Sequence, residues 1–314
     1  MRRFITNFIR EFNHNVSKYD SNKDRLVNEN EITNTINYIN SINKENLKEV
    51  HKNLNEDITL ALVGLTYTTY FSFAVNQDEH ENPMHKDFFD ETFENVTPSL
   101  LYQNMITIIS NHVLSIIKLV EAGLDTSARA LIRVLAETVF IFIIVFSSKD
   151  HFVNYCNGMN DEDASTVWYR FFSHKKTQVE LKKIEKRIGL PEEIVSEINK
   201  IRTSIYKEFP SVVHSSAYTS ILGSYAFDFN KDQLQIGVGG KASKASKNTL
   251  STLNWLLFYF SIMTKGILTN LFEFKPRSDN EMWRVVFPIR ECFIELYLKI
   301  TYKDDYESIS TRIT

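Results

Sequence analysis

Three charged residues recur at four-residue intervals near the middle of the chain: Arg129, Arg133 and Glu137. Four-residue steps advance about 400° around an α-helix, so these side chains share one helix face. The other residues of the segment 128–146 are nearly all apolar, a pattern typical of a buried helix. Charged groups on such a helix must be paired or must line a wet cleft, because an unpaired buried charge is strongly destabilising.

Two interpretations of this charged face are open. In the first, Arg133 and Glu137 form a structural ion pair at helical spacing. In the second, Arg129 and Arg133 line a pocket that holds an anion such as a phosphate. Glu137 would then orient Arg133, and Arg129 would meet the anionic ligand.

His214 is a candidate for proton transfer at the same place. An imidazole with a pKa near its ordinary value passes protons at cellular pH, and an arginine beside it can hold a phosphate. Together they would cleave RNA without a metal, and Tyr206 would add a hydroxyl group. The alternative is that His214 is satisfied by hydrogen bonds where a helix ends.

Oxygen-bearing residues near the N-terminus partly match an EF-hand calcium loop. They occupy the first, third, fifth and twelfth positions of the loop: Asp20, Asn22, Asp24 and Glu31. Arg25 stands where the sharp turn requires glycine, and no second loop pairs with this one. The segment is therefore either a degenerate calcium site or a polar loop between helices, and the sequence indicates no other cofactor.

Glycine (9) and proline (6) are scarce in these 314 residues, which favours long helices with few turns. Gly123 is placed to end a helix over residues 98–122, and Asp125 to cap the next. So short a connection predicts an antiparallel hairpin of helices. Alternating residues around a polar turn predict one β-hairpin at residues 224–238.

The predicted fold is mainly α, an antiparallel helical bundle with one small β-hairpin. An acidic segment at residues 77–98 suggests a division into an N-terminal helical region, 1–97, and a main bundle, 98–314. Within the first region, we expect two helices divided near residues 40–43. The net charge of −3 excludes a global positive field for nucleic acid. A local basic stripe remains on one predicted helix: Lys175, Lys176, Lys182, Lys183, Lys186 and Arg187.

The stretch at residues 123–137 resembles a signature of an uncharacterised bacterial helical family, in which glycine is followed by Arg-x-x-x-Glu. A second signature would correspond to residues 206–216, which end near His214, and the resemblance covers roughly residues 100–270. Such families resemble the HEPN helical bundles, many of which are ribonucleases or partners in toxin–antitoxin and phage-defence systems. HEPN ribonucleases carry four to six residues between an arginine and a following histidine; only three residues separate Arg170 from His174, one too few for that motif.

This resemblance implies an effector or accessory protein of bacterial anti-phage defence, with metal-independent ribonuclease activity as the leading chemistry. The alternative is a non-catalytic sensor module that binds a nucleotide or a partner protein in the same cleft. RNA or a nucleotide, a partner protein and a second copy of the chain are the expected partners. The aromatic residues Trp255, Phe258, Tyr259 and Phe260 suggest an apolar helix face for a homo-oligomer.

A cytoplasmic location without membrane insertion is expected. The two cysteines, Cys156 and Cys292, form no recognisable disulfide framework. The apolar segment 250–272 is interrupted by polar residues that include Asn254 and Lys265, which is typical of a core helix.

Overall fold

The structure is a computed structural model. It describes residues 29–77, 97–160, 168–208, 225–227, 229, 234–236, 240–275 and 280–302, and the isolated helical residues 6, 7, 9–11, 13 and 14. The described chain is mainly α-helical, as the scarcity of glycine and proline predicts.

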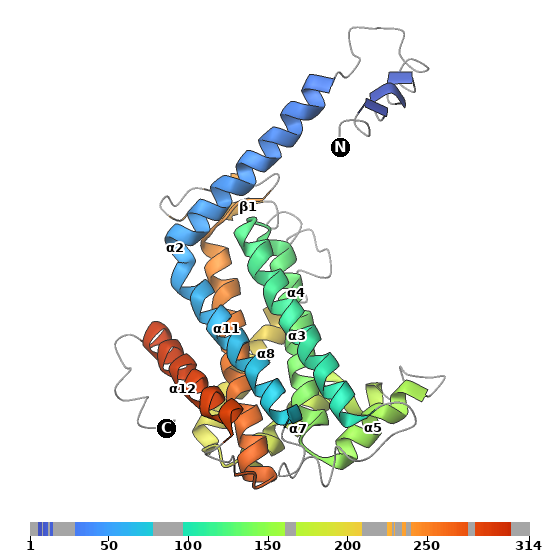
Figure 1. The fold of residues 1–314 in the computed structure, drawn as a ribbon, viewed down its shortest axis with the longest axis vertical. Helices are drawn as coiled ribbons and strands as arrows, with labels where there is room; N and C mark the ends of the chain where they lie inside the picture. Colours follow the sequence, from blue (N-terminus) through green and yellow to red (C-terminus); the bar gives the residue numbers. More distant parts are fainter. Residues whose placement is uncertain are drawn as a thin grey trace.

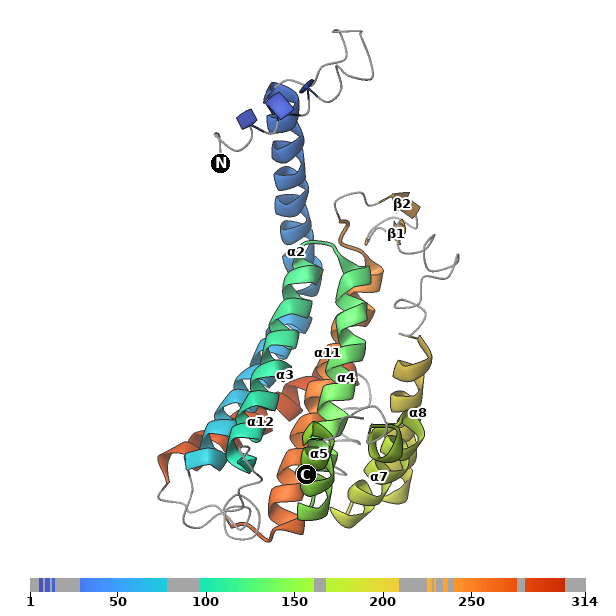
Figure 2. The same cartoon turned by 90° about the vertical axis from the view of Figure 1, so that its right-hand side faces the viewer.

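Five long helices form an elongated bundle, and three shorter ones pack along one side of it (Figure 1; Figure 2). The long helices are α2 (Glu29–Gln77), α3 (Pro98–Glu121), α4 (Asp125–Val145), α11 (Lys244–Gly266) and α12 (Glu281–Thr301). The shorter ones are α5 (Lys149–Asn160), α7 (His174–Arg187) and α8 (Glu192–Glu208). Single π-helical turns, η3 (Trp168–Phe172) and η4 (Ile267–Leu271), precede α7 and extend α11. Because α4 contacts α3, α5, α7, α8 and α11, it lies at the centre of the molecule.

The second half of α4 is buried on every side, as its apolar sequence predicts. All residues from Val139 to Phe146 are buried. Their aromatic rings pack edge to face with the neighbouring helices; Tyr102 of α3, for example, lies 5.0 Å from Phe142 and 4.9 Å from Phe146 between ring centroids. This apolar half fixes α4 in the core, while its first half carries the charged face.

The connection between α3 and α4 confirms one expectation and corrects another. Gly123 follows the end of α3 with a φ of 73°, the left-handed conformation that ends many helices. Asp125 was expected to cap α4, but α4 begins without a side-chain cap. The carboxylate of Asp125 instead accepts a hydrogen bond of 2.6 Å from the Thr249 hydroxyl of α11, so a tertiary contact replaces the local one.

Helix α2 spans 49 residues and consists of two helical parts that meet at a kink, as expected, but the division lies at Leu54 and not near residues 40–43. Residues 40–43 contain no glycine or proline to end a helix. The one break in helical geometry is at Leu54, with φ −129° and ψ 18°. Near this kink, the amide of Asn254 on α11 donates a 3.0 Å hydrogen bond to the Asp57 carbonyl of α2, a side-chain contact of the kind found at helix kinks.

The C-terminal part of α2 packs against α3, α11 and α12, whereas its N-terminal part projects beyond the bundle (Figure 1). Near the projecting part lie two strands, β1 (Tyr225–Phe227) and β2 (Leu234–Ile236), which pair antiparallel with Tyr225 opposite Ile236. Residues 230–233, which would connect them, lie outside the described residues.

The aromatic residues of α11 that were expected to face a second copy of the chain lie inside this one. Trp255, Tyr259 and Phe260 are buried, and Phe258 stacks on Tyr297 of α12 with ring centroids 4.2 Å apart. The expectation of an outward aromatic face is therefore wrong, because α2, α4 and α12 pack against α11. Self-association itself stays a prediction.

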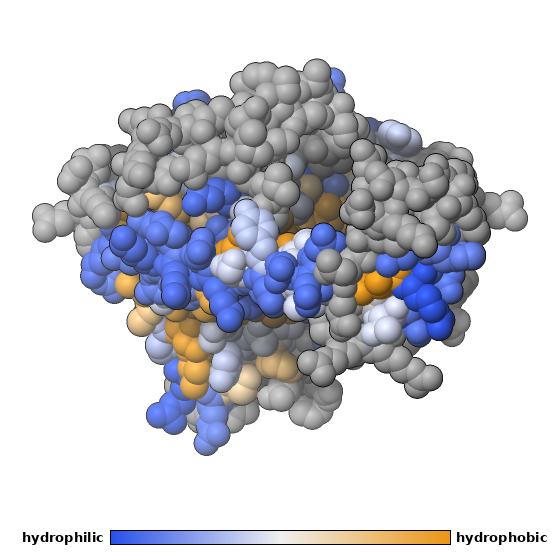
Figure 3. Space-filling view, turned by 90° about the horizontal axis from the view of Figure 1, so that it is seen from above, coloured by the Kyte–Doolittle hydropathy of each residue, from blue (hydrophilic) through white to orange (hydrophobic). Residues whose placement is uncertain are grey.

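Two described helices are long and apolar enough to cross a membrane: residues Thr33–Val75 of α2, and α3. Core helices of soluble proteins have the same length and composition, so this finding does not assign a location. Seen from above, the described surface is mostly hydrophilic, with small hydrophobic areas between the polar side chains (Figure 3). The cytoplasmic location stays a prediction.

A buried asparagine joins three segments at the upper end of the bundle. Asn46 of α2 donates hydrogen bonds to the carbonyls of Ala122 (3.0 Å) and Gly240 (3.1 Å), and its side-chain oxygen accepts one from the Ala242 amide (3.1 Å). A Cβ atom on Gly123 would lie only 2.7 Å from the Asn46 amide nitrogen, so glycine is required for this close approach.

We predict that Asn46→Ala lowers the free energy of unfolding by about 2–4 kcal/mol, because it leaves buried backbone groups without partners. Urea denaturation measures this change. The matched control is Asn53→Ala on the same helix, since Asn53 is exposed and bonds only to Glu49 one turn away. Equal effects of the two substitutions would contradict the role of Asn46 as a junction.

Candidate functional site

The charged face of α4 contains an ion pair. The Arg133 Nε atom donates to the Glu137 Oε1 atom at 2.6 Å, one helical turn away. The two side chains keep 23% and 35% of their surface exposed, so the pair lies at the edge of the core and is open to solvent. The contact uses Nε, and an arginine has further N–H donors on its terminal nitrogens that can bind an anion.

Two other helices bring aromatic and titratable groups to this pair. The guanidinium carbon of Arg133 lies 4.5 Å from the ring centroid of Tyr206 on α8, a cation–π contact. The imidazole of His174, the first residue of α7, lies 3.9 Å from the same ring between centroids. Arg133, Glu137, His174 and Tyr206 therefore form one group, here named the Arg133 cluster.

The electrostatics of the Arg133 cluster favour uncharged forms of His174 and Tyr206. Partial burial lowers the pKa of His174 below its ordinary value; the Arg133 charge lowers this pKa further, and Glu137 opposes it. Burial, followed by the Glu137 charge, raises the pKa of the Tyr206 hydroxyl above its ordinary range. At neutral pH the cluster thus contains a neutral imidazole that can accept a proton, a phenol that keeps its proton and a guanidinium that attracts an anion.

A buried ion pair behind the cluster fixes the helices that carry it. Arg202 of α8 donates from Nη1 to Glu185 of α7 in a close contact, and neither side chain is exposed. The Arg202 Nε atom donates to Gln178 at 2.8 Å. The Tyr259 hydroxyl of α11 donates to Glu185 at 2.7 Å, so three helices meet at this pair.

Helical periodicity carries this constraint to the Arg133 cluster. Tyr206 follows Arg202 by four residues, and His174 precedes Glu185 by eleven, close to three full turns. Each cluster residue therefore lies on the same face of its helix as its partner in the buried ion pair. Pairing Arg202 with Glu185 directs Tyr206 and His174 toward each other and toward α4.

The sequence-predicted site residues have different outcomes. Arg133 and Glu137 form the predicted ion pair. Arg129 is half-buried one turn before Arg133. Burial raises the pKa of Asp125, and the hydrogen bond from Thr249 and the charge of Arg129 oppose this rise. His214 lies outside the described residues, so its predicted convergence with the helix face stays a prediction.

His174 was missed because its arginine partner comes from another helix. In the sequence, the nearest arginine before His174 is Arg170, and the spacing of this pair does not match the HEPN ribonuclease motif. The structure places His174 against Arg133 of α4 and Tyr206 of α8, a contact that no spacing within α7 could indicate.

Of the predicted calcium ligands, Asp20, Asn22 and Asp24 lie outside the described residues, and Glu31 is exposed in the first turn of α2. Among the residues that the structure describes, no three His, Cys, Asp or Glu side chains gather as a metal site would require. Calcium binding stays a prediction.

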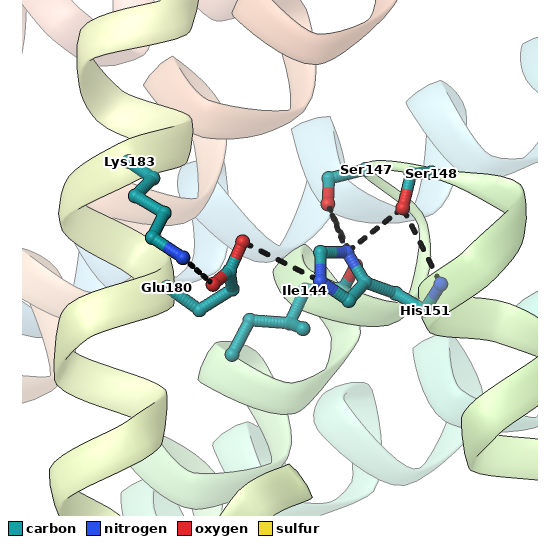
Figure 4. Close-up of polar contacts among 6 residues, drawn as sticks. All are labelled: Ile144, Ser147, Ser148, His151, Glu180 and Lys183. Atoms are coloured by element: carbon teal, nitrogen blue, oxygen red, sulfur yellow. Dashed lines mark hydrogen bonds and ion pairs between the residues drawn. The ribbon is translucent and has the colours of Figure 1, made fainter.

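A second histidine, His151 of α5, connects two serine hydroxyls to the Glu180 carboxylate of α7 in a polar relay (Figure 4). The His151 Nδ1 atom lies 2.9 Å from the Ser148 hydroxyl, and its Nε2 atom lies 3.4 Å from the Glu180 carboxylate. The Ser147 hydroxyl, 3.1 Å from Nδ1, donates to the Ile144 carbonyl. The Glu180 carboxylate can only accept a proton from Nε2, so Nδ1 is the acceptor and the Ser148 hydroxyl is its donor. This assigns the proton of the neutral ring to Nε2, facing Glu180. Burial is the main cause that lowers the pKa of His151.

A large cavity lies elsewhere, between α2, α8, α11 and α12. It has a volume of about 980 Å³, and its lining is mostly polar. Trp255 and Tyr297 contribute aromatic surface, while Glu56, Asp57 and Lys247 contribute charge. The Arg133 cluster does not line this cavity.

No family model, curated protein or solved structure matches this chain.

We predict that Arg202→Met lowers the free energy of unfolding by about 3–5 kcal/mol, because Glu185 is left buried without its cation. The double variant Arg202→Met/Glu185→Leu should recover most of this loss, since it removes both charges. Urea denaturation of the two variants measures the difference.

Lys200→Met is the control on the same helix, because Lys200 forms an exposed ion pair with Glu197. Its effect should stay below about 1 kcal/mol. A double variant as unstable as the single one would show that the Arg202–Glu185 pair is not the constraint on α7 and α8.

Proposed function

We propose that this protein is a HEPN-like effector or accessory protein of bacterial defence against phage, and that it cleaves RNA without a metal at the Arg133 cluster. The observation that carries the chemistry is the meeting of His174, Tyr206 and the Arg133–Glu137 pair from three helices. The resemblance of residues 123–137 to a bacterial helical family supports the proposed role in defence against phage.

Each member of the cluster has one task in this reaction. Glu137 holds the Nε edge of Arg133, which leaves the terminal guanidinium nitrogens for the phosphate of the RNA. Neutral His174 takes the proton of the ribose 2′-hydroxyl, and the pKa lowered by burial and by Arg133 keeps the imidazole in this basic form. Tyr206 retains its proton and is the donor for the leaving oxygen.

The bond changes in this reaction balance. The 2′-oxygen forms a bond to phosphorus, and the bond between phosphorus and the 5′-oxygen breaks. The Tyr206 proton goes to the departing 5′-oxygen, and the proton on His174 then returns to Tyr206. The products are a 2′,3′-cyclic phosphate and a 5′-hydroxyl end. Arg133 stabilises the charge that develops on the phosphate oxygens.

The alternative function is a non-catalytic sensor module that binds a nucleotide or a partner protein. The cavity of about 980 Å³ favours it, because a volume of that size is typical of small-molecule sites. Its lining combines the aromatic rings of Trp255 and Tyr297 with carboxylates and amides, groups that recognise a nucleobase or a peptide. In this case the Arg133 cluster would be structural.

We predict that expression of the chain in a bacterial host arrests growth and fragments total RNA into pieces with 5′-hydroxyl ends. His174→Gln should lower the cleavage rate by about a hundredfold or more, the usual contribution of acid–base catalysis. Gel analysis of total RNA and labelling of 5′-hydroxyl ends by polynucleotide kinase measure both effects.

His112→Gln on α3 is the matched control, because it makes the same change at a half-buried histidine outside the Arg133 cluster. It should retain full cleavage. Growth arrest with intact RNA would favour the sensor module, and cleavage that persists in His174→Gln would overturn the proposed mechanism.

A further inference from the structure

A second cavity, of about 450 Å³, lies between the end of α4, α5, η3 and the outer face of α7. Its lining combines cations, the His151–Glu180 relay and apolar side chains: Ile144, His151, Asn154, Arg170, Phe171, Phe172, Lys175, Lys176, Val179, Glu180 and Lys183. None of these residues belongs to the Arg133 cluster, so the cavity is a separate feature.

The cavity has an excess of positive charge. Four cationic side chains line it, Arg170, Lys175, Lys176 and Lys183, against the single carboxylate of Glu180. Glu180 is shared by Lys183, at 2.9 Å, and the Nε2 atom of His151. Among the described residues, Arg170, Lys175 and Lys176 have no carboxylate partner. Three cations around one small cavity attract an anion with several charges.

One wall of the same cavity is apolar and partly aromatic. Phe171 is half-buried, and the Arg170 guanidinium carbon lies 5.1 Å from its ring centroid. Phe172 is buried and packs edge to face on Tyr155 with centroids 5.4 Å apart, which fixes the base of this wall. An aromatic surface beside cations suits a ligand that has a flat ring as well as a phosphate.

The elements that carry these cations are connected to one another. The Lys176 ammonium donates to the Arg170 carbonyl at 2.5 Å, so the first turn of α7 holds the π-helical turn η3 in place. On the other side, Glu180 connects α7 to His151 of α5 (Figure 4). The site is therefore assembled from three elements that contact one another, and it does not depend on one flexible side chain.

We propose that this cavity binds a nucleoside monophosphate group, with the phosphate between Arg170, Lys175 and Lys176 and the base against Phe171. A volume of about 450 Å³ lies in the range of small-molecule sites. The group would be a free mononucleotide or the phosphorylated end of an RNA strand, which share this chemistry. The proposal does not depend on ribonuclease activity, because the residues of the two sites differ.

Calorimetric titration of the full chain with uridine 5′-monophosphate, inorganic phosphate and uridine tests this site. We expect the monophosphate to bind at one site, inorganic phosphate to bind more weakly, and uridine to show no binding. The double variant Lys175→Gln/Lys176→Gln should weaken binding of the monophosphate about tenfold, the effect of losing charge-assisted contacts.

Lys182→Gln/Lys186→Gln is the matched control on the same helix, because both lysines pair with Glu192 and neither lines the cavity. It should change the affinity less than about twofold. Equal weakening by both double variants, or no binding of the monophosphate to the wild-type chain, would overturn the proposal. Competition by a 5′-phosphorylated trinucleotide would support a strand end as the ligand, and a lack of competition would support a free nucleotide.

Discussion

The ion pair between Arg202 and Glu185 is the constraint on which the candidate site depends. Two buried charges are stable only when they meet with good geometry, so α7 and α8 have one relative position that satisfies both. Tyr259 adds a hydrogen bond from α11 and ties this helix pair to the main bundle. Burial raises the pKa of the Tyr259 hydroxyl to about 12, so that group remains a donor to the carboxylate. The pairing of Tyr206 with His174 beside Arg133 follows from this position and from helical periodicity.

Helix α7 has two polar faces, and each belongs to a different candidate site. One face carries His174, Gln178 and Glu185 toward α4, α8 and α11, where Gln178 and Glu185 both bond to Arg202 and His174 packs on Tyr206. The outer face carries Lys176, Glu180 and Lys183 toward α5 and the cavity of about 450 Å³. The basic stripe that the sequence indicates is therefore not one surface: Lys182 and Lys186 pair with Glu192, while Lys175, Lys176 and Lys183 line the cavity.

Local patterns in the sequence predict the features that depend on one helix. The apolar run of α4, the left-handed Gly123 and the ion pair one turn apart are all of this kind. Features that depend on contacts between distant segments could not be predicted in this way. The kink at Leu54 lies near the hydrogen bond from Asn254 of α11 to α2. Asp125 bonds to Thr249 of α11 and does not cap its own helix. His174 belongs to the same group, because its partners Arg133 and Tyr206 lie on two other helices.

Arg133, Glu137 and His174 act on one another electrostatically, and an NMR titration of the His174 ring measures this interaction directly. We expect the pKa of His174 to lie below the ordinary histidine value in the wild-type chain, to increase in Arg133→Gln, and to decrease further in Glu137→Gln. Lys149→Gln, at the start of α5, should leave this pKa unchanged. A pKa of His174 that is the same in the wild-type chain and in both cluster variants would contradict the account.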